Sequence, residues 1–365
     1  MTQPPFGTFF LPGPTQVRAE VLAAMAQPMM PHRGAQFEAL FGRVQDGLRH
    51  VFRTTRPVYV STSSATGLME AAIRCAPPGP ILSLVNGAFS ERFAAIARGC
   101  GREIRVLDAP LGTVHDLRDV EAALAANTYA AMSVVHSETS TGALADIAAL
   151  SAVGHRYGTA ILVDSVTGIA GAPVETDAWQ LDFVLTGSQK ALALPPGLAF
   201  GVASESFLAH ARAAKNRGLY FDIVEFEEYA QRNQTPNTPA LPLLYAADVQ
   251  LSAIRAEGIE TRWARHAAMA QATWEWTERC RANGLDIGIL APAGARSPTV
   301  SAITLPAGAT GAQIVKRVGE QGFVIGGGYG ALKDRTFRIG HMGDHTVAGL
   351  ANCLAVCEDA LHAGR

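Results

Sequence analysis

The amino-acid sequence predicts an α/β fold, in which a large domain carries a mainly parallel sheet covered by helices and a smaller C-terminal domain is α+β. Three observations support this prediction. Between residues 57 and 204, short runs rich in β-branched residues alternate with longer helical patterns. The short runs are apolar throughout, which is typical of strands buried on both faces of a parallel sheet. After about residue 240, the pattern changes to long helices followed by short strands.

The first part of the chain supplies the expected strands of the large sheet. They are 57–62, 81–86, 130–137, 160–165, 182–187 and 198–204. Amphipathic stretches such as 67–76 and 143–158 separate several of these strands and are expected to be helices. Gly154, Gly158 and the proline-rich segment 77–80 interrupt the patterns and indicate turns.

The second part of the chain begins with a helical region from about Leu241 to Asn283, interrupted near Gly258. The expected strands that follow are 297–306, 322–328 and 335–343, and the expected closing helix is 346–363. We therefore expect a large domain at 20–245. Residues 1–19 and 246–365 are expected to form the small domain, with the N-terminal segment packed against the C-terminal part.

The composition argues against several classes of protein. Hydrophobic residues make up 48% and charged residues 17% of the chain, so part of the apolar surface is expected to be covered by another subunit. A net charge of -2 argues against nucleic acid as a partner. No run of about 18 apolar residues indicates a membrane span. The N-terminus lacks a basic segment followed by an apolar one, so it does not resemble a secretory signal.

The five cysteines are scattered and form no CxxC pair, which favours reduced thiols in a cytoplasmic protein. Cys353 and Cys357 lie four residues apart on an expected helix and could bind a metal ion together. Neither histidine nor a further cysteine adjoins the pair. We interpret both as buried packing residues and expect no metal site.

Polar side chains stand at the ends of the expected strands, where ligands bind in doubly wound sheets. Small hydroxyl residues at 63–67 open a helix after the first strand. They could bind an anion through free backbone N–H groups, or simply cap the helix. Phe89 follows the second strand, and a polar segment at 136–142 follows the third. Asp164 ends the fourth strand, and Lys190 follows the fifth.

Taken singly, each of these residues has an ordinary structural explanation. Phe89 could be a core aromatic, Asp164 an N-cap, and Lys190 a surface residue whose stem crosses apolar neighbours. Together they form the set that pyridoxal 5′-phosphate requires. A lysine forms a Schiff base with it, a carboxylate keeps the pyridine nitrogen protonated, and a helix start binds the phosphate.

Motifs along nearly the whole chain resemble those of the class V aminotransferases of fold type I, and most of all the alanine/serine–glyoxylate aminotransferase group. In chain order they are FLPGPTQV, SSATGLMEAA, NGAFSER, HSETSTG, VDSVTG, TGSQKALALPPG, QTPNTP and FRIGHMG. GSQK…PPG and RIGHMG are the specific ones. The resemblance implies a pyridoxal-phosphate enzyme that moves an amino group from a small amino acid, such as alanine or serine, to glyoxylate or pyruvate.

The resemblance also assigns site residues. Lys190 would be the Schiff-base lysine, Asp164 the partner of the pyridine nitrogen, and Phe89 the aromatic ring stacked on the cofactor. Arg338 would hold the substrate α-carboxylate in a bidentate fork that lysine cannot match. The other residues assigned to the cofactor are Ser64, Ala65, Thr66, Thr139, Gln189 and Thr238. Gly13, in the N-terminal GPT, is assigned to the substrate.

Two further expectations follow from the resemblance. Thr238 would reach the phosphate of the neighbouring subunit, which implies a homodimer with shared active sites. His136 and Glu138 are expected to form local hydrogen bonds, since the released lysine normally transfers the proton.

Other functions stay open at this point. Four spare cations could serve a second anionic group, as in a transaminase for phosphoserine, aspartate or 2-aminoethylphosphonate; they are His32, Arg33, Arg217 and Arg335. A cysteine desulfurase or a related lyase is disfavoured, because the loop 326–335 has no cysteine. A catalytically silent binding domain would have no physical need for both Lys190 and Asp164. The sequence GGGYG at 326–330 is not the GxGxxG of a dinucleotide dehydrogenase.

Overall fold

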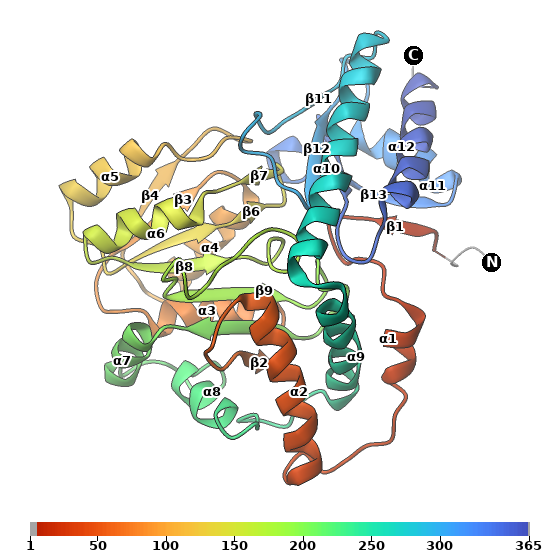
Figure 1. Cartoon of the computed structure of the whole chain (residues 1–365). Helices are drawn as coiled ribbons and strands as arrows, with labels where there is room; N and C mark the ends of the chain where they lie inside the picture. Colours follow the sequence, from red (N-terminus) through yellow and green to blue (C-terminus); the bar gives the residue numbers. More distant parts are fainter. Residues whose placement is uncertain (1–5, 364–365) are drawn as a thin grey trace.

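The computed structural model describes residues 6–363 and contains a large and a small sheet with helices packed on them (Figure 1). The large sheet has seven strands. In spatial order they are β2 (Tyr59–Ser61), β10 (Ala199–Ala203), β9 (Phe183–Gly187), β8 (Ala160–Asp164), β5 (Ala131–Val135), β3 (Ile81–Val85) and β4 (Ile104–Asp108). Neighbouring strands are parallel except where β10 pairs with β9 and β2. The prediction of a mainly parallel sheet is therefore confirmed.

Helices cover both faces of the large sheet, because its strands alternate buried apolar residues toward two separate cores. One core lies under α2 (Ala35–Phe52), α5 (Leu117–Ala126), α6 (Ile147–Arg156) and α9 (Leu241–Glu257). The other lies under α3 (Ala65–Cys75), α4 (Ala88–Gly99), α7 (Glu205–Ala213) and α8 (Ile223–Ala230). Leu82 belongs to the first core and its neighbour Ile81 to the second.

The sequence analysis missed strand β4. This strand lies at the edge of the sheet, where it pairs only with β3. Its residues are half-buried or exposed, and they include Arg105 and Asp108. An edge strand needs no continuous apolar run, so the pattern that revealed the inner strands was absent here.

The small sheet has five strands, in the order β1 (Thr8–Phe10), β13 (Phe323–Gly327), β14 (Thr336–Gly340), β12 (Val300–Thr304) and β11 (Gly288–Ile289). Its core includes residues of α10 (Ile259–Ala282), α11 (Gly311–Glu320) and α12 (Val347–His362). The remaining elements are α1 (Ala19–Ala24), the hairpin of β6 (Ser137–Glu138) and β7 (Ala143–Leu144), and a 3₁₀ turn at Gly330–Leu332. Strand β1 pairs with β13 in parallel, so the N-terminal segment lies beside the C-terminal part (Figure 1).

We propose that the boundary between the two domains lies at Gly258. This glycine separates α9 from α10 and has a φ of 83°, which favours glycine. Helix α9 packs on α1 and α2, whereas α10 contributes Met269 and Trp276 to the core of the small sheet. The expected boundary at residue 245 falls inside α9.

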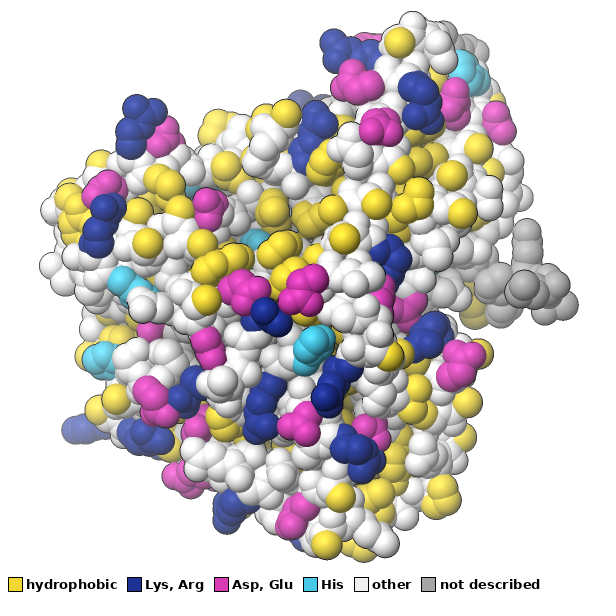
Figure 2. All heavy atoms as spheres, in the orientation of Figure 1, with side chains coloured by type: hydrophobic (Ala, Val, Ile, Leu, Met, Phe, Trp, Pro, Cys, Tyr) yellow, Lys and Arg dark blue, Asp and Glu magenta, His cyan; other side chains and the backbone are white. Residues whose placement is uncertain are grey.

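The structure also describes the cysteines, possible metal clusters, long apolar helices and the distribution of charge. The five cysteines are free, and Cys353 and Cys357 are buried in the core of the small sheet. Within residues 6–363, no cluster of His, Cys, Asp or Glu could hold a metal ion, and no helix is long and apolar enough to cross a membrane. On the face drawn in Figure 2, acidic and basic side chains are interspersed.

Candidate active site

A cavity of about 260 Å³ lies at the carboxyl ends of β5, β8 and β9, beside the first turn of α3. Eight of the residues assigned from the sequence line it: Ser64, Ala65, Thr66, Phe89, Thr139, Asp164, Gln189 and Lys190. Parallel strands bring these residues together because their carboxyl ends share one edge of the sheet. The cavity is thus built from segments that lie far apart in the sequence.

Lys190 is the buried cation of this cavity, with a side chain 9% exposed. Its Nζ donates a hydrogen bond to the carbonyl oxygen of Pro12, in the N-terminal segment. Burial lowers the pKa of Lys190 to about 8; the nearby charge of Arg338 also lowers it, and Asp164 opposes the shift. A larger fraction of the amine is therefore uncharged near neutral pH than in a lysine exposed to water.

Asp164 is the buried carboxylate at the end of β8. One of its oxygens accepts a hydrogen bond of 2.8 Å from the backbone N–H of Val166. Among residues 6–363, no hydrogen bond is made to the other oxygen, and burial raises the pKa of the carboxyl to about 7. A cationic ligand in the cavity would relieve this penalty, because an opposite charge stabilises the ionised carboxylate.

The first turn of α3 presents backbone N–H groups to the cavity. Ser64 is the N-cap, but its side chain makes no capping hydrogen bond. The N–H of Gly67 bonds to the Ser64 carbonyl at 3.0 Å, while those of Ala65 and Thr66 have no acceptor in the described part of the chain. Unbonded N–H groups at a helix start bind anions. The Gln189 side chain lines the same cavity.

An aromatic ring and a pair of hydroxyls complete the wall. Phe89, in the first turn of α4, stacks on Tyr329 with ring centroids 5.4 Å apart. The hydroxyls of Thr139 and Thr167 bond to each other at 2.5 Å. Thr167 was not assigned from the sequence.

His136 and Glu138 form local hydrogen bonds, as expected. His136 bonds to the Ser165 hydroxyl at 2.9 Å, and burial lowers the pKa of its ring to about 4. Glu138 is fully buried and accepts hydrogen bonds from the backbone N–H groups of Phe89 and Ser90. It therefore holds the first turn of α4, which carries Phe89, against the hairpin formed by β6 and β7.

Arg338, on β14 of the small sheet, does not line the cavity but contacts Thr139, which does. Its Nε donates to the Gly327 carbonyl at 2.8 Å, and its Nη1 donates to the Thr139 carbonyl at 3.0 Å. The guanidinium carbon lies 5.4 Å from the centre of the Tyr329 ring. The small sheet thus brings a buried cation to the segment that carries Thr139.

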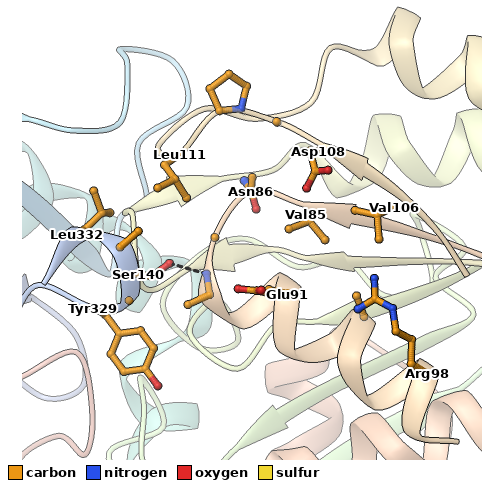
Figure 3. Close-up of a pocket in the computed structure, with 17 residues that line it drawn as sticks. Val85, Asn86, Glu91, Arg98, Val106, Asp108, Leu111, Ser140, Tyr329 and Leu332 are labelled. Atoms are coloured by element: carbon orange, nitrogen blue, oxygen red, sulfur yellow. Dashed lines mark hydrogen bonds between the residues drawn. The ribbon is translucent and has the colours of Figure 1, made fainter.

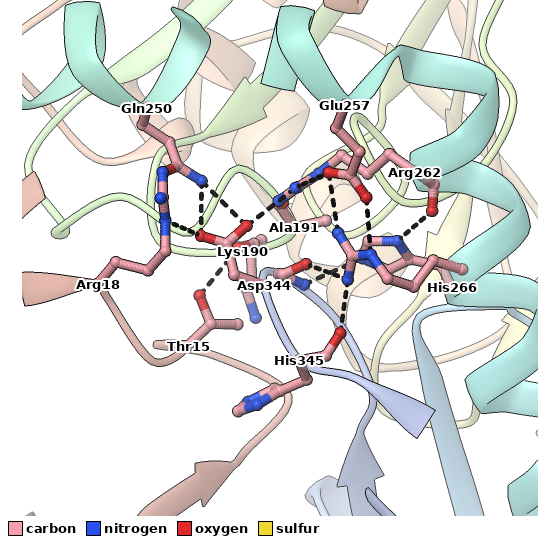
Figure 4. Close-up of polar contacts among 12 residues, drawn as sticks. Thr15, Arg18, Lys190, Ala191, Gln250, Glu257, Arg262, His266, Asp344 and His345 are labelled. Atoms are coloured by element: carbon pink, nitrogen blue, oxygen red, sulfur yellow. Dashed lines mark hydrogen bonds and ion pairs between the residues drawn. The ribbon is translucent and has the colours of Figure 1, made fainter. Parts of the chain in front are cut away.

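A network of charged side chains supports the backbone around Lys190 (Figure 4). Arg262, 1% exposed, donates to the Ala191 carbonyl at 2.7 Å and forms ion pairs with Glu257 and Asp344. The Thr15 hydroxyl donates to the Lys190 carbonyl at 3.0 Å. Asp344 follows β14, so one network joins the lysine segment, the α9–α10 junction and the segment that follows Arg338. Arg18 and Gln250 add further bonds to Asp344.

Gly13 lies against Lys190. A Cβ built on Gly13 would lie 2.5 Å from the Lys190 Nζ, and the φ of Gly13 is 108°. Only a residue without a side chain leaves the lysine amine its present position. The structure therefore places Gly13 beside the cavity, although it does not line it.

Thr238 does not line the cavity. It is exposed in the loop before α9 and lines a separate hollow with Thr62 and Tyr220. The four spare cations do not line the cavity either. Arg217 is paired with Asp222 at 2.9 Å, and the guanidinium of Arg33 lies over Tyr229.

Sequence reasoning missed several residues of the cavity wall: Met69, Arg92, Val135, Ser137, Val166 and Thr167. Most of them adjoin a predicted site residue in the sequence or lie one helical turn away from it. Arg92, one turn after Phe89, is the charged member of this group. A search for residues three or four positions from each assigned helix residue would have found it.

Comparison with known proteins gives a consistent result. The family model for aminotransferase class-V matches residues 9–328. The chain is 32% identical to serine–glyoxylate aminotransferase of Methylorubrum extorquens, covering 96% of this chain and 90% of that one. It is 31% identical to L-aspartate–glyoxylate aminotransferase of Paracoccus denitrificans, covering 96% and 89%.

A solved structure agrees with these matches. That of an alanine–glyoxylate aminotransferase from Nostoc sp. superposes with a TM-score of 0.91 at 28% identity, covering 99% of this chain and 96% of that one. The match extends over both sheets, because it leaves almost none of the chain uncovered. The chain belongs to the class-V aminotransferase family.

Proposed function

We propose that this aminotransferase uses pyridoxal 5′-phosphate to move the amino group of a small amino acid to a 2-oxo acid, with glyoxylate as the preferred acceptor. The observation that carries the proposal is one cavity that holds a buried lysine, a buried carboxylate and unbonded N–H groups of a helix start. The class-V family itself depends on this cofactor.

The cavity wall fits the cofactor group by group. The N–H groups of Ala65 and Thr66 would bind its phosphate, together with the Gln189 side chain. One oxygen of Asp164 accepts no hydrogen bond from residues 6–363, and burial disfavours ionisation of the carboxyl. A protonated pyridine nitrogen would supply a donor and stabilise the carboxylate. Lys190 would hold the aldehyde group, and Phe89 would lie against the ring.

The reaction needs a base at the substrate Cα. When bound, the cofactor supplies an electron sink for the carbanion that forms there. The pKa of Lys190 is lowered to about 8, which suits its amine to take up the α-proton of the donor and to release it again within the cavity. Arg338 would hold the α-carboxylate in a bidentate pair, which orients the Cα–H bond toward the lysine.

The acceptor is proposed from the relatives. Serine–glyoxylate and L-aspartate–glyoxylate aminotransferases resemble this chain over nearly its whole length, as does the alanine–glyoxylate enzyme of known structure. Glyoxylate is the substrate that the names of these three enzymes share, while their amino donors differ. We therefore propose glyoxylate first and pyruvate second as acceptors.

We also propose a homodimer in the cytoplasm with shared active sites. The exposed position of Thr238, away from the cavity of its own subunit, supports a role in the site of a partner. Tyr220, 48% exposed, lines the same hollow as Thr238, and its neighbour Leu219 is 84% exposed, so both supply apolar surface for a second subunit.

The rival functions have less support. The described cysteines do not line the cavity, so a desulfurase lacks its nucleophile there. A silent binding domain would gain nothing from burying both Lys190 and Asp164, because each costs free energy without its ligand.

A direct test begins with the colour of the purified protein. We expect a visible absorbance band from bound pyridoxal phosphate, and we expect Lys190→Ala to lack it. A panel of amino donors should then be assayed against glyoxylate, pyruvate and 2-oxoglutarate. A colourless protein that binds no cofactor contradicts the proposal, and acceptance of 2-oxoglutarate alone contradicts the choice of glyoxylate.

A further inference from the structure

Arg92 is a cation in the cavity wall that the proposed reaction does not use. It lies in the first turns of α4 and lines the cavity with Phe89, Asp164 and Lys190. Its Nη2 lies 3.4 Å from the Tyr329 hydroxyl, and its guanidinium carbon lies 5.7 Å from the centre of the Phe89 ring. In the part of the chain that the structure describes, it has no ion pair.

Arg92 and Arg338 lie on two sides of one aromatic pair. Phe89 and Tyr329 are stacked, Arg92 contacts both of them, and the Arg338 guanidinium lies over Tyr329. Arg338 is the residue proposed for the substrate α-carboxylate. The aromatic pair thus lies between a cation in the cavity wall, Arg92, and the cation proposed for the α-carboxylate, Arg338.

Acidic side chains near Arg92 do not neutralise it. Glu138 is committed to the N–H groups of Phe89 and Ser90 and to Ser140. Glu91 is exposed and lines the adjacent hollow rather than the cavity. The positive charge of Arg92 also helps to stabilise the ionised form of Asp164. Arg92 itself is exposed to solvent, and a guanidinium at a cavity wall can pair with a carboxylate or phosphate group.

The adjacent hollow leaves space beside Tyr329 (Figure 3). It measures about 600 Å³ and is lined by Glu91, Arg98, Asp108 and the turn from Tyr329 to Leu332. Tyr329 is 37% exposed and stands between two glycines, Gly328 and Gly330. Its ring therefore lines the adjacent hollow, while its hydroxyl lies next to Arg92 of the cavity wall.

We propose that Arg92, together with the Tyr329 hydroxyl, forms a subsite for a second anionic group on the amino donor, while Arg338 holds the α-carboxylate. This inference rests on the proposed function and extends its donors to amino acids with an anionic side chain. A carboxylate and a phosphate share the chemistry that the subsite recognises. Arg92 was not among the four cations that the sequence analysis suggested for this role.

The test compares donors rather than total activity. Aspartate, glutamate, phosphoserine and alanine are assayed with glyoxylate in the wild-type enzyme and in Arg92→Met and Arg92→Lys. Loss of a charge-assisted hydrogen bond should lower the ratio of kcat/KM for the preferred anionic donor to that for alanine roughly 10- to 100-fold in Arg92→Met. Arg92→Lys should restore part of the ratio. Arg98→Met is the matched control, since Arg98 lies on the same helix but lines the outer hollow, and it should keep the wild-type ratio.

A second readout needs no turnover. Binding of maleate, a dicarboxylate, and of propionate, a monocarboxylate, is followed by the change in the visible absorbance of the bound cofactor. We expect Arg92→Met to weaken maleate binding at least 10-fold more than propionate binding. The inference is overturned if Arg92→Met affects both anions equally, or if the ratio of anionic to neutral donors does not fall. In that case turnover of alanine by the wild-type enzyme would still support the proposed function. A wild-type enzyme that transaminates none of the donors would contradict both the subsite and the proposed function.

Discussion

Replacing Asp164 with asparagine should make the cofactor-free protein more stable at pH 8, although it should weaken cofactor binding. The carboxyl is buried, and its pKa is raised from 3.8 to about 7, chiefly by burial. A group whose folded pKa is raised binds its proton more tightly in the folded state. The free energy of unfolding therefore falls as the pH rises from about 4 to about 7, and the full loss is present above pH 7.

The size of the effect follows from the shift. A difference of about 3 pKa units corresponds to about 4 kcal/mol, since each unit is about 1.4 kcal/mol. This is a ceiling, because water entering the cavity reduces the burial penalty. Asparagine removes the charge and keeps an oxygen that can accept from the Val166 N–H.

The assay is urea unfolding followed by circular dichroism, with cofactor-free wild type and Asp164→Asn measured at pH 4.5 and pH 8. Asp146→Asn is the control, because Asp146 is an exposed N-cap of α6 and asparagine caps a helix equally well. The stabilisation by Asp164→Asn should be large at pH 8 and small at pH 4.5, while the control stays near zero at both. Equal stability of Asp164→Asn and wild type at pH 8 would refute the reasoning.

Three further predictions concern the residues around Lys190. Gly13→Ala should lower kcat at least 10-fold, because the added Cβ displaces the amine of Lys190. Gly34→Ala is the control: its φ is 120° and no atom lies within 4 Å of the added Cβ, so it should lower only stability. Equal kcat values for the two variants would contradict this prediction. Arg262→Met should lower the free energy of unfolding by about 1.5–3 kcal/mol in urea, because the half-buried carboxylates of Glu257 and Asp344 lose their buried cation. Arg281→Met on the same helix, in an exposed pair, should cost under about 1 kcal/mol, and similar losses for the two variants would argue against the network. Arg338→Lys keeps the charge but loses the planar fork, so the donor KM should rise by about 10-fold or more in steady-state assays, and an unchanged KM would exclude the clamp.

The inner strands and the residues at their ends could be predicted from the sequence because both follow from local patterns. A strand covered on both faces must be apolar along its length, as 160–165 is, and the next polar residue then marks the carboxyl end. This is why Asp164 and Lys190 were assigned and do line one cavity. The edge strand β4 was not predicted, because its half-buried and exposed residues do not form a continuous apolar run.

Arg92 and Arg262 could not be assigned in this way, since their surroundings are set by distant parts of the chain. Arg92 meets Tyr329 across 237 positions, and Arg262 meets Ala191 across 71. In the sequence each is an arginine within a helical stretch, where a solvated side chain is the ordinary interpretation. Arg338, on the small sheet, likewise contacts Thr139, which lies 199 positions away. We propose cofactor chemistry for the groups at the strand ends of the large sheet, whereas the side chains proposed to select and orient the donor depend on contacts between distant segments. Donor preference is for this reason the property that a sequence pattern predicts least well in this fold.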